Sequence, residues 1–406
     1  MSSNNKKGKN LEDIQEMNLA LVIRTMRFSD VCSRAQIAKE TGLKKSTITN
    51  IVNILIECGL VKETGILDGE NGRRSIGIAL NGEKYKVLGA RLSRRFYSVM
   101  LFDIQGNVDE IVTERIEDVE PEIAFNRLKK TMHEMIDRAA DCTVLSIGVA
   151  VPGPFIRREG RIVLMTGYPG WEHIPLKEEL KKDFSIPVYL EHDANLGALA
   201  EWWYESERNE DNTLLFVLAA NGIGAGIVIN GKIFTGFLGT AGEIGHMSIN
   251  FDGPQCECGN KGCLTKYCSI LSMRKRIEDE LNHYPESELK KDCSSEAIIR
   301  AIQSQDPLAE KVFNDAAWYL GFGLSNVINI INPDQIIIGD QLSKVGKPLH
   351  DIVSQVIKEH VLDEVYDKIQ IKLSTLDTDP ILLGSGLLAI DKIFEPVALK
   401  KTQNYL

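Results

Sequence analysis

Apolar residues recur at the spacing of α-helices in the first sixty positions. Over residues 11–26 they fall on one stripe, which predicts an amphipathic helix, and the stripe consists of Leu11, Ile14, Met17, Leu21 and Ile23. Ser33 and Gln36 form the signature of a capping box, so a short second helix should begin there and end at Gly42. A third helix should begin at 44–47, and its apolar stripe consists of Ile48, Ile51, Val52 and Leu55. This order predicts a helix-turn-helix.

Two strand-like runs, 61–66 and 75–80, flank a turn-rich segment at 68–72, which predicts a β-hairpin wing. In a helix-turn-helix the second helix of the pair enters the major groove, where lysines contact phosphates and Ser, Thr or Asn reach base edges. The candidate DNA-binding residues are Arg34, Lys44, Lys45, Ser46, Thr47, Thr49, Asn50, Arg73 and Arg74. The alternatives are a packing module without DNA and, for Arg73 and Arg74, solvated or salt-bridging roles.

From about residue 84 the pattern changes to that of an α/β domain. Strand-like apolar runs lie at 85–92, 96–103, 144–151, 188–190, 214–219, 225–229 and 335–338. Helical patterns lie at 123–140, 306–331 and 351–362. The chain therefore combines a small helical head with a larger body in which strands and helices alternate.

Composition and charge differ between the head and the body, and this difference bears on what each part binds. The chain has 406 residues, 43% of them hydrophobic and 26% charged, which is typical of a soluble protein with more than one domain. We find no apolar run of about 18 residues and no signal peptide, and therefore expect a cytoplasmic protein without membrane contact. Residues 1–80 hold 12 Lys and Arg against 9 Asp and Glu, whereas the remainder holds 35 against 48. A basic head on an acidic body favours nucleic-acid binding by the head.

Four motifs in the body resemble, in order and spacing, those of the ROK family of repressors and sugar kinases. They are GVAVPGP at 148–154, EHDAN at 191–195, GEIGH at 242–246 and CECGNKGC at 256–263. With a winged helix in front, the chain is similar to ROK regulators of the xylose-repressor type. The resemblance implies a body of two actin-like, ribonuclease-H-like α/β lobes with a sugar cleft between them. We place the winged helix at 1–82, the first lobe at 83–196 with a C-terminal return at about 376–395, and the second lobe at 197–375.

A metal site is predicted from the cysteine spacing. Cys256, Cys258 and Cys263 lie in one glycine-containing loop, and His246 precedes them, so tetrahedral Cys₃His coordination of Zn²⁺ is feasible. Four protein ligands leave no open position, which makes the predicted zinc structural. Such clustering suits a metal better than a disulfide scaffold. Cys268 is a rival ligand that the resemblance disfavours, and a loop of three reduced cysteines without metal is the alternative.

A sugar ligand requires charged or amide groups in a cleft, and Asp193, Glu243 and His246 are the candidates. The resemblance implies that Asp193 corresponds to the base of the kinases and that Glu243 and His246 contact the sugar. A turn or helix cap before Ala194 is the alternative for Asp193. The chain departs from the kinases at two positions, since His192, which is also a candidate sugar-binding residue, replaces the usual Asn and Thr265 replaces a common Glu. Gly170, with Trp171 beside it, is a further candidate through an apolar platform.

The kinase phosphate-binding turn is missing. The kinases carry Asp-x-Gly-Gly-Thr after the first strand, whereas residues 91–95 read Arg-Leu-Ser-Arg-Arg, without the acid or the glycines. A second glycine-rich turn remains at 221–226. We therefore assign no catalytic residue and expect no enzyme activity.

We predict a repressor of carbohydrate-utilisation genes that binds double-stranded operator DNA and responds to a sugar in the cleft. It should act as a homodimer or larger oligomer on a palindromic site, with an interface around residues 306–362. The alternative is a ROK sugar kinase with an accessory DNA-binding head.

Overall fold

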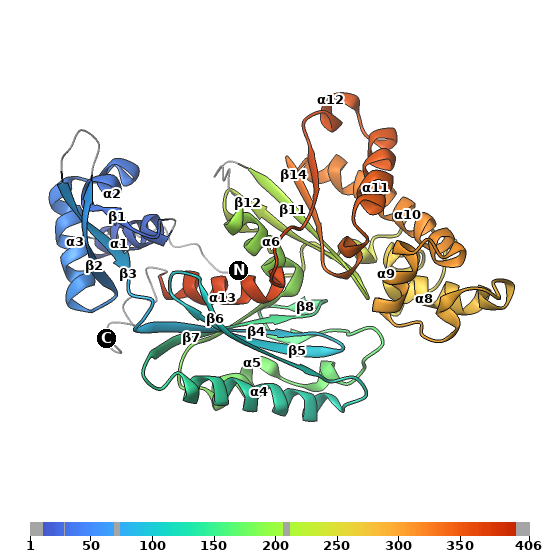
Figure 1. Ribbon diagram of the computed structural model, residues 1–406, viewed down its shortest axis with the longest axis horizontal. Helices are drawn as coiled ribbons and strands as arrows, with labels where there is room; N and C mark the ends of the chain where they lie inside the picture. The colour runs from blue at the N-terminus through green and yellow to red at the C-terminus, as the bar shows by residue number, and fades with distance from the viewer. Residues whose placement is uncertain (1–10, 28, 69–73, 206–211, 395–406) are drawn as a thin grey trace.

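The polypeptide forms an N-terminal head and a two-lobed body in the computed structural model, which describes residues 11–27, 29–68, 74–205 and 212–394 (Figure 1). The elements of the head are α1 (Leu11–Arg27), β1 (Cys32–Ser33), α2 (Arg34–Thr41), α3 (Lys45–Glu57), β2 (Val61–Asp68) and β3 (Arg74–Leu80). Its strands form a small sheet in the order β1-β3-β2. The predicted winged helix-turn-helix is confirmed, and the tip of its wing, 69–73, lies outside the described residues.

Local sequence signals determine where α2, the first helix of the helix-turn-helix, begins and ends. The Ser33 hydroxyl accepts a hydrogen bond from the Gln36 backbone N–H at 3.2 Å, and the Gln36 side chain accepts one from the Ser33 N–H at 2.9 Å. This is the predicted capping box. Gly42 follows α2 with a φ of 68°, a left-handed conformation that glycine adopts without steric cost.

Helix α1 buries a different face from the predicted one. Ile14, Met17 and Leu21 are 45%, 44% and 40% exposed, whereas Ile23 is buried together with Val22 and Met26. Only the last turns of α1 pack into the hydrophobic core. The periodicity therefore identified the helix but, of these buried residues, only Ile23, because burial depends on which part of the helix meets the rest of the protein.

The first lobe contains a mixed sheet in the order β10-β7-β4-β5-β6. Its strands are β4 (Tyr85–Leu92), β5 (Phe96–Asp103), β6 (Val108–Arg115), β7 (Thr143–Val151) and β10 (Val188–His192). Helices α4 (Pro121–Arg138) and α5 (Leu176–Asp183) cover one face, and β8 (Phe155–Ile156) pairs with β9 (Arg161–Ile162) beyond β7. The sequence did not predict β6, because this edge strand is mostly exposed and lacks an apolar run.

The second lobe contains a sheet in the order β13-β12-β11-β14-β15. Its strands are β11 (Thr213–Ala219), β12 (Ile223–Ile229), β13 (Lys232–Ile233), β14 (Gln335–Gly339) and β15 (Gln370–Leu373). Its helices are α7 (Thr265–Cys268), α8 (Ile270–Glu280), α9 (Ser295–Gln303), α10 (Pro307–Ile331), α11 (Lys347–His360) and α12 (Asp363–Tyr366). None of the helices in the described ranges is both long and apolar enough to cross a membrane.

Two helices, α6 (Asp193–Tyr204) and α13 (Pro380–Ile393), connect the lobes (Figure 1). Their backbones approach closely, since a Cβ atom on Gly384 of α13 would lie 1.9 Å from the carbonyl oxygen of Leu196 in α6. A Cβ atom on Gly148 of β7 would lie 2.0 Å from the carbonyl oxygen of Ser385. The boundary proposed at 196/197 falls inside α6, and α13 lies within the proposed C-terminal return.

The head rests on the same two helices. Arg27, the last residue of α1, is buried, and its guanidinium lies 4.1 Å from the centre of a Trp203 ring in α6. Its Nη1 is 3.6 Å from the Asp391 carboxylate in α13. Buried residues of the head, α6 and α13 form one continuous hydrophobic cluster. The head is therefore packed onto the helices that join the lobes.

A buried acid in α6 should make stability fall as the pH rises. Burial raises the pKa of Glu201 to about 7, from a usual value of 4.5, although a hydrogen bond from Ser374 lowers it. Because the folded pKa exceeds the unfolded one, this stability is fully present below pH 4.5 and is lost as the pH rises through about 7. The loss amounts to roughly 3 kcal/mol.

Urea unfolding of the wild type between pH 5 and pH 8 should show this decline in the free energy of unfolding. Glu201→Gln should abolish most of it, because a neutral amide can keep the Ser374 contact. The control Glu134→Gln, on the exposed face of α4, should retain the wild-type pH dependence. An unchanged decline in Glu201→Gln would show that other groups cause it.

Candidate functional site

A cavity of about 690 Å³ lies between the two lobes, lined by residues of both. Its wall includes segments that follow β4, β7, β10 and β14, together with the turn between β11 and β12. These are the carboxyl ends of parallel strands, where α/β proteins commonly bind ligands. The volume falls in the range of small-molecule sites. The cavity is therefore the candidate ligand cleft.

One wall is held by a buried ionic cluster around Arg91, the residue that begins the altered phosphate turn. Arg91 donates hydrogen bonds to Asp379, the N-cap of α13, and to Asp340, which follows β14, at 2.5 Å for the latter. Burial alone would lower the pKa of Arg91, but the two carboxylates raise it above its usual value. Asp340 has a φ of 66°, a strained conformation for a residue with a side chain. Arg91 thus ties the first lobe to the second.

An acidic group that includes Asp193, at the start of α6, lies near this cluster. His192 Nε2 is 3.2 Å from an Asp193 carboxylate oxygen and 3.9 Å from one of Glu243. Burial raises the pKa of both Asp193 and Glu243, while His192 opposes the shift. A Cβ atom on Gly153 would lie 2.2 Å from His192 Nε2, so only glycine lets the turn after β7 approach. The arrangement presents hydrogen-bond acceptors and an imidazole to a polar ligand.

The structure brings four of the five predicted sugar residues together. His192, Asp193, Glu243 and His246 line the cavity, and so does Thr265. Asp193 also accepts a hydrogen bond from the Ala194 N–H at 2.7 Å, but His192 is the N-cap of α6, so Asp193 is not the helix cap of the alternative interpretation.

The prediction of an apolar platform at Gly170 and Trp171 is wrong. Gly170 is not among the residues that line the cavity. Trp171 is fully buried in the first lobe, where its ring packs against Phe125 and Tyr168. Its size and apolar surface favour the core over the cleft.

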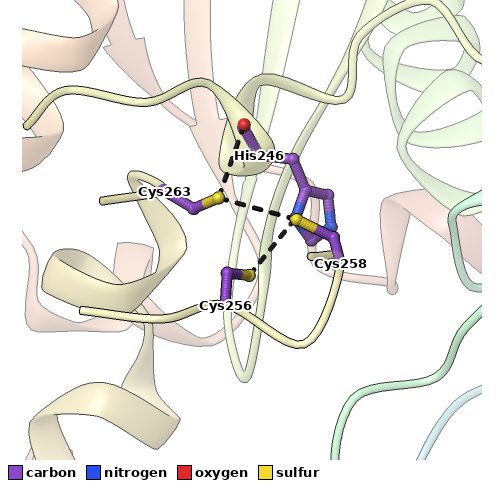
Figure 2. Close-up of side chains that lie close together, drawn as sticks. All are labelled: His246, Cys256, Cys258 and Cys263. Atoms are coloured by element: carbon purple, nitrogen blue, oxygen red, sulfur yellow. Dashed lines mark hydrogen bonds between the residues drawn. The ribbon is translucent and has the colours of Figure 1, made fainter. Parts of the chain in front are cut away.

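His246, Cys256, Cys258 and Cys263 form a cluster whose ligand atoms all lie within 4.8 Å of one another (Figure 2). The Sγ atoms of Cys258 and Cys263 are 3.7 Å apart, and Cys256 Sγ is 3.7 Å from His246 Nδ1. A tetrahedral metal with sulfur ligands at about 2.3 Å requires sulfur separations of about 3.8 Å. The four residues therefore fit one metal ion.

Cys268 lies outside this cluster. It is buried in α7, and its thiol donates to the Leu264 carbonyl oxygen at 3.4 Å. His246 belongs both to the cluster and to the cavity wall, so the metal loop forms part of the cleft.

The predicted DNA-binding residues gather mainly on α3. Lys44, the N-cap of α3, is exposed, as are Lys45, Ser46, Thr49 and Asn50, whereas Thr47 is half-buried. Arg34 lies nearby but contacts Glu63 at 3.4 Å and Asn53 at 3.5 Å. Arg74 is exposed at the start of β3, and Arg73 lies outside the described residues. The head therefore presents a polar helix face with two lysines at its N-terminal end.

Sequence reasoning missed Asp340 and Arg94, which line the cavity, and Asp379, which pairs with the cavity residue Arg91. Asp340 directly follows the buried strand β14, and an acid at the carboxyl end of a parallel strand was a usable signal. Asp379 precedes Pro380 at a helix start and reads as a cap alone. The sequence does not distinguish Arg94 from neighbouring arginines, because Gly222, which it approaches in the cavity wall, belongs to the second lobe.

Comparison with known proteins gives consistent matches. A model described as the ROK family matches residues 98–398. The xylose repressor of Caldicellulosiruptor bescii is 29% identical over 382 residues, which cover 91% of this chain and 94% of that protein. A solved ROK family transcriptional regulator, described as a homolog of the E. coli MLC protein, has a TM-score of 0.80 at 27% identity and covers 96% of this chain and 98% of its own. The ROK hexokinase of Thermus thermophilus has a TM-score of 0.62 at 25% identity and covers 76% and 99%.

The Arg91 cluster should be a major contributor to stability. Arg91→Ala would leave the carboxylates of Asp340 and Asp379 without their cation, and removal of one partner from a buried ion pair costs roughly 3–5 kcal/mol. The control Arg95→Ala removes more exposed pairs with Glu117 and Glu296, which should cost about 1 kcal/mol or less. Urea unfolding followed by tryptophan fluorescence measures both. Equal losses in the two variants would contradict the assignment.

Proposed function

The chain belongs to the ROK family, whose model covers residues 98–398, and we propose that it is a DNA-binding transcriptional repressor controlled by a sugar. The observation that carries this proposal is the packing of a winged helix-turn-helix onto α6, which begins at the ligand cleft, and α13, whose N-cap Asp379 pairs with the cleft residue Arg91. The xylose repressor that resembles this chain over most of both lengths supports the same reading.

The sugar would lie in the cleft beside Asp193. The carboxylates of Asp193 and Glu243 would accept hydrogen bonds from hydroxyl groups, and His192 and His246 would complete the polar surface. Charge-assisted hydrogen bonds of this kind contribute about 1.5–3 kcal/mol each. Several of them would supply the difference in affinity between two lobe arrangements that a regulatory ligand requires.

The ligand signal would travel along α6 and α13. Asp193 begins α6, and Trp203, near the end of that helix, stacks on Arg27 of the head. Asp379 caps the start of α13, and Asp391 near its end pairs with Arg27. A shift of either helix caused by the ligand would therefore reach the DNA-binding head directly.

We infer that the chain is not a kinase, although a ROK hexokinase shares the body fold. Phosphoryl transfer needs a cradle of backbone N–H groups and an acid that helps to place a metal. Here Arg91 begins that turn, and its guanidinium is engaged by Asp340 and Asp379. A paired arginine supplies neither function.

The Cys₃His cluster would hold a structural Zn²⁺ ion. Three thiolates and one imidazole suit zinc, and four protein ligands leave no position for catalysis. The ion would fix the loop from His246 to Cys263 and so orient His246 in the cleft wall.

Two copies of the chain would bind a palindromic operator, because paired heads double the phosphate contacts. The surface of α10 and α11 supports this assembly. Trp318 is 40% exposed and stacks on Phe322, with His360 packed edge-on against both rings. An exposed aromatic cluster of this kind is typical of protein interfaces.

The first test concerns DNA recognition. With an operator selected from a random duplex library, Lys45→Ala should weaken binding to every sequence and reduce the salt slope by about one unit. Asn50→Ala should cost about 1–3 kcal/mol on the selected operator and little on other DNA. Fluorescence anisotropy measures both effects, with Lys130→Ala on α4 as the control. Unchanged operator binding in both variants would place recognition elsewhere.

The second test concerns the ligand. A thermal-shift screen of pentoses and hexoses should identify a stabilising sugar that changes operator affinity. Asp193→Asn keeps the side-chain shape and should bind operator normally but lose at least about tenfold in sugar affinity. Asp183→Asn, on α5 and outside the cavity, is the control. A fully responsive Asp193→Asn protein would exclude the cleft as the sensor.

The third test concerns the metal. The purified protein should contain one zinc per chain, and Cys258→Ser should lose most of it. Because zinc positions His246, the same variant should lose sugar response before operator binding. Cys142→Ser lies outside the cluster and should retain both metal and response. Full zinc content in Cys258→Ser, measured by plasma mass spectrometry, would refute the ligand set.

A further inference from the structure

A hairpin of the first lobe and a loop of the second lobe touch each other beside the cavity. The hairpin of β8 and β9 follows Gly153, the loop 234–242 precedes Glu243, and Gly153 and Glu243 both line the cavity. A Cβ atom on Gly239 of the loop would lie 2.5 Å from the Cβ atom of Arg157 in the turn of the hairpin. A movement of one lobe relative to the other would therefore change this contact.

Arg157 extends from this contact to a buried acid near the start of α6. Its Nε atom lies 3.3 Å from Oε2 of Glu191, whose side chain is 1% exposed, whereas that of Arg157 is 39% exposed. The other carboxylate oxygen, Oε1, accepts hydrogen bonds from the backbone N–H of His192 and from Nδ2 of Asn195, each at 3.0 Å. Glu191 is thus held by the hairpin through one oxygen and holds the start of α6 through the other.

The residues that Glu191 holds belong to the ligand cleft. His192 is the N-cap of α6 and Asp193 its first residue, and both line the cavity. Neither Arg157 nor Glu191 is among the described residues that line it. Because a buried carboxylate is costly without a cation, loss of the Arg157 contact would leave Glu191 uncompensated and disturb its hydrogen bond with the His192 N–H. Arg157 and Glu191 can therefore act on the ligand only through His192 and Asp193.

We propose that Arg157 and Glu191 are positioning residues that couple the contact between the lobes at Gly239 to the orientation of His192 and Asp193. The inference rests on the proposed ligand cleft and describes how that cleft is regulated. While the lobes touch, Gly239 covers Arg157 and confines its side chain beside Glu191. Separation of the lobes releases the guanidinium to solvent, so a ligand that needs both cavity residues in place favours the closed contact.

Hydrogen exchange of the full-length protein without ligand tests the coupling. Arg157→Gln removes the cation and should accelerate exchange of the peptide 188–196, which includes the His192 amide, by about tenfold or more. Arg157→Lys keeps the charge and should restore part of the protection. Arg161→Gln removes a charge from the same hairpin, where it pairs with Glu159, and should exchange like the wild type. Unchanged exchange of this peptide in Arg157→Gln would overturn the proposal.

A second variant tests the same coupling from the other lobe. The added methyl group of Gly239→Ala would overlap Arg157, so exchange of the peptide 188–196 should accelerate although the substitution lies in the second lobe. Gly346→Ala is the matched control, because Gly346 has a φ of 81°, against 90° for Gly239, and a Cβ atom there would meet no described atom beyond its chain neighbours within 4 Å. Both substitutions strain the backbone, but only the first contacts Arg157. A change confined to the loop 234–242 in Gly239→Ala would contradict the coupling.

Calorimetry with D-xylose, D-glucose and N-acetyl-D-glucosamine then measures the effect on the ligand site. A sugar of this set that binds the wild type should bind Arg157→Gln about tenfold or more weakly, Arg157→Lys less weakly, and Arg161→Gln normally. Equal affinity of Arg157→Gln and the wild type for that sugar would overturn the positioning role. If the wild type binds none of the three, the result counts against the proposed sugar cleft, and the exchange measurements decide the coupling. Operator binding without sugar reports separately on the proposed repressor function.

Discussion

Close packing of α6 against α13 between the two sheets is the constraint on which the rest of the structure depends. The contact requires glycine at Gly384 of α13, where a Cβ atom would overlap the Leu196 carbonyl of α6. Gly386 of α13 and Gly226 of β12 similarly let α13 approach Phe102 of β5 and β12 approach Ala194 of α6. Because the helices cannot separate without losing the core they share, their ends have defined positions. The N-terminal end of α6 carries Asp193 in the cleft, and the N-terminal end of α13 carries Asp379, which pairs with the cleft residue Arg91. The C-terminal ends of both helices meet Arg27 of the head.

The cleft itself is organised by buried charge. A buried charge is costly unless it is paired, so the position of each charged side chain is tied to that of its partner. Arg91 of β4 pairs with Asp340, which follows β14, and with Asp379, which precedes α13. These ion pairs add an electrostatic link between the lobes to the close helix packing. The phosphate turn of the related kinases is thereby replaced by a lobe-to-lobe ionic contact, while the cleft and its acidic residues are kept.

The loop from His246 to Cys263, which carries the candidate metal ligands, contributes to another wall of the cleft. His246 lies on a short helical turn after the β13 region, far in sequence from β10 and α6, yet it shares the cavity with Asp193. Coordination by three cysteines of one loop would hold this histidine where backbone hydrogen bonds alone leave freedom. The cleft thus combines a helix start, an ionic cluster and a loop that a metal ion would fix.

The features that the sequence by itself determined are those with local causes. The capping box at Ser33, the buried stripe of α3, the strands β4 and β5 and the Cys-x-Cys spacing each depend on residues a few positions apart, so periodicity and turn chemistry predicted them. The family motifs likewise pointed to His192, Asp193, Glu243 and His246, which the fold brings to the cavity wall. The tertiary structure alone decided which face of α1 is buried, that Trp171 belongs to the core, and that β6 completes the first sheet. It also decided that Arg91 meets Asp340 and Asp379, 249 and 288 residues away, and that Arg94 faces Gly222. Such contacts arise when distant segments pack together, and no local pattern of side chains records them.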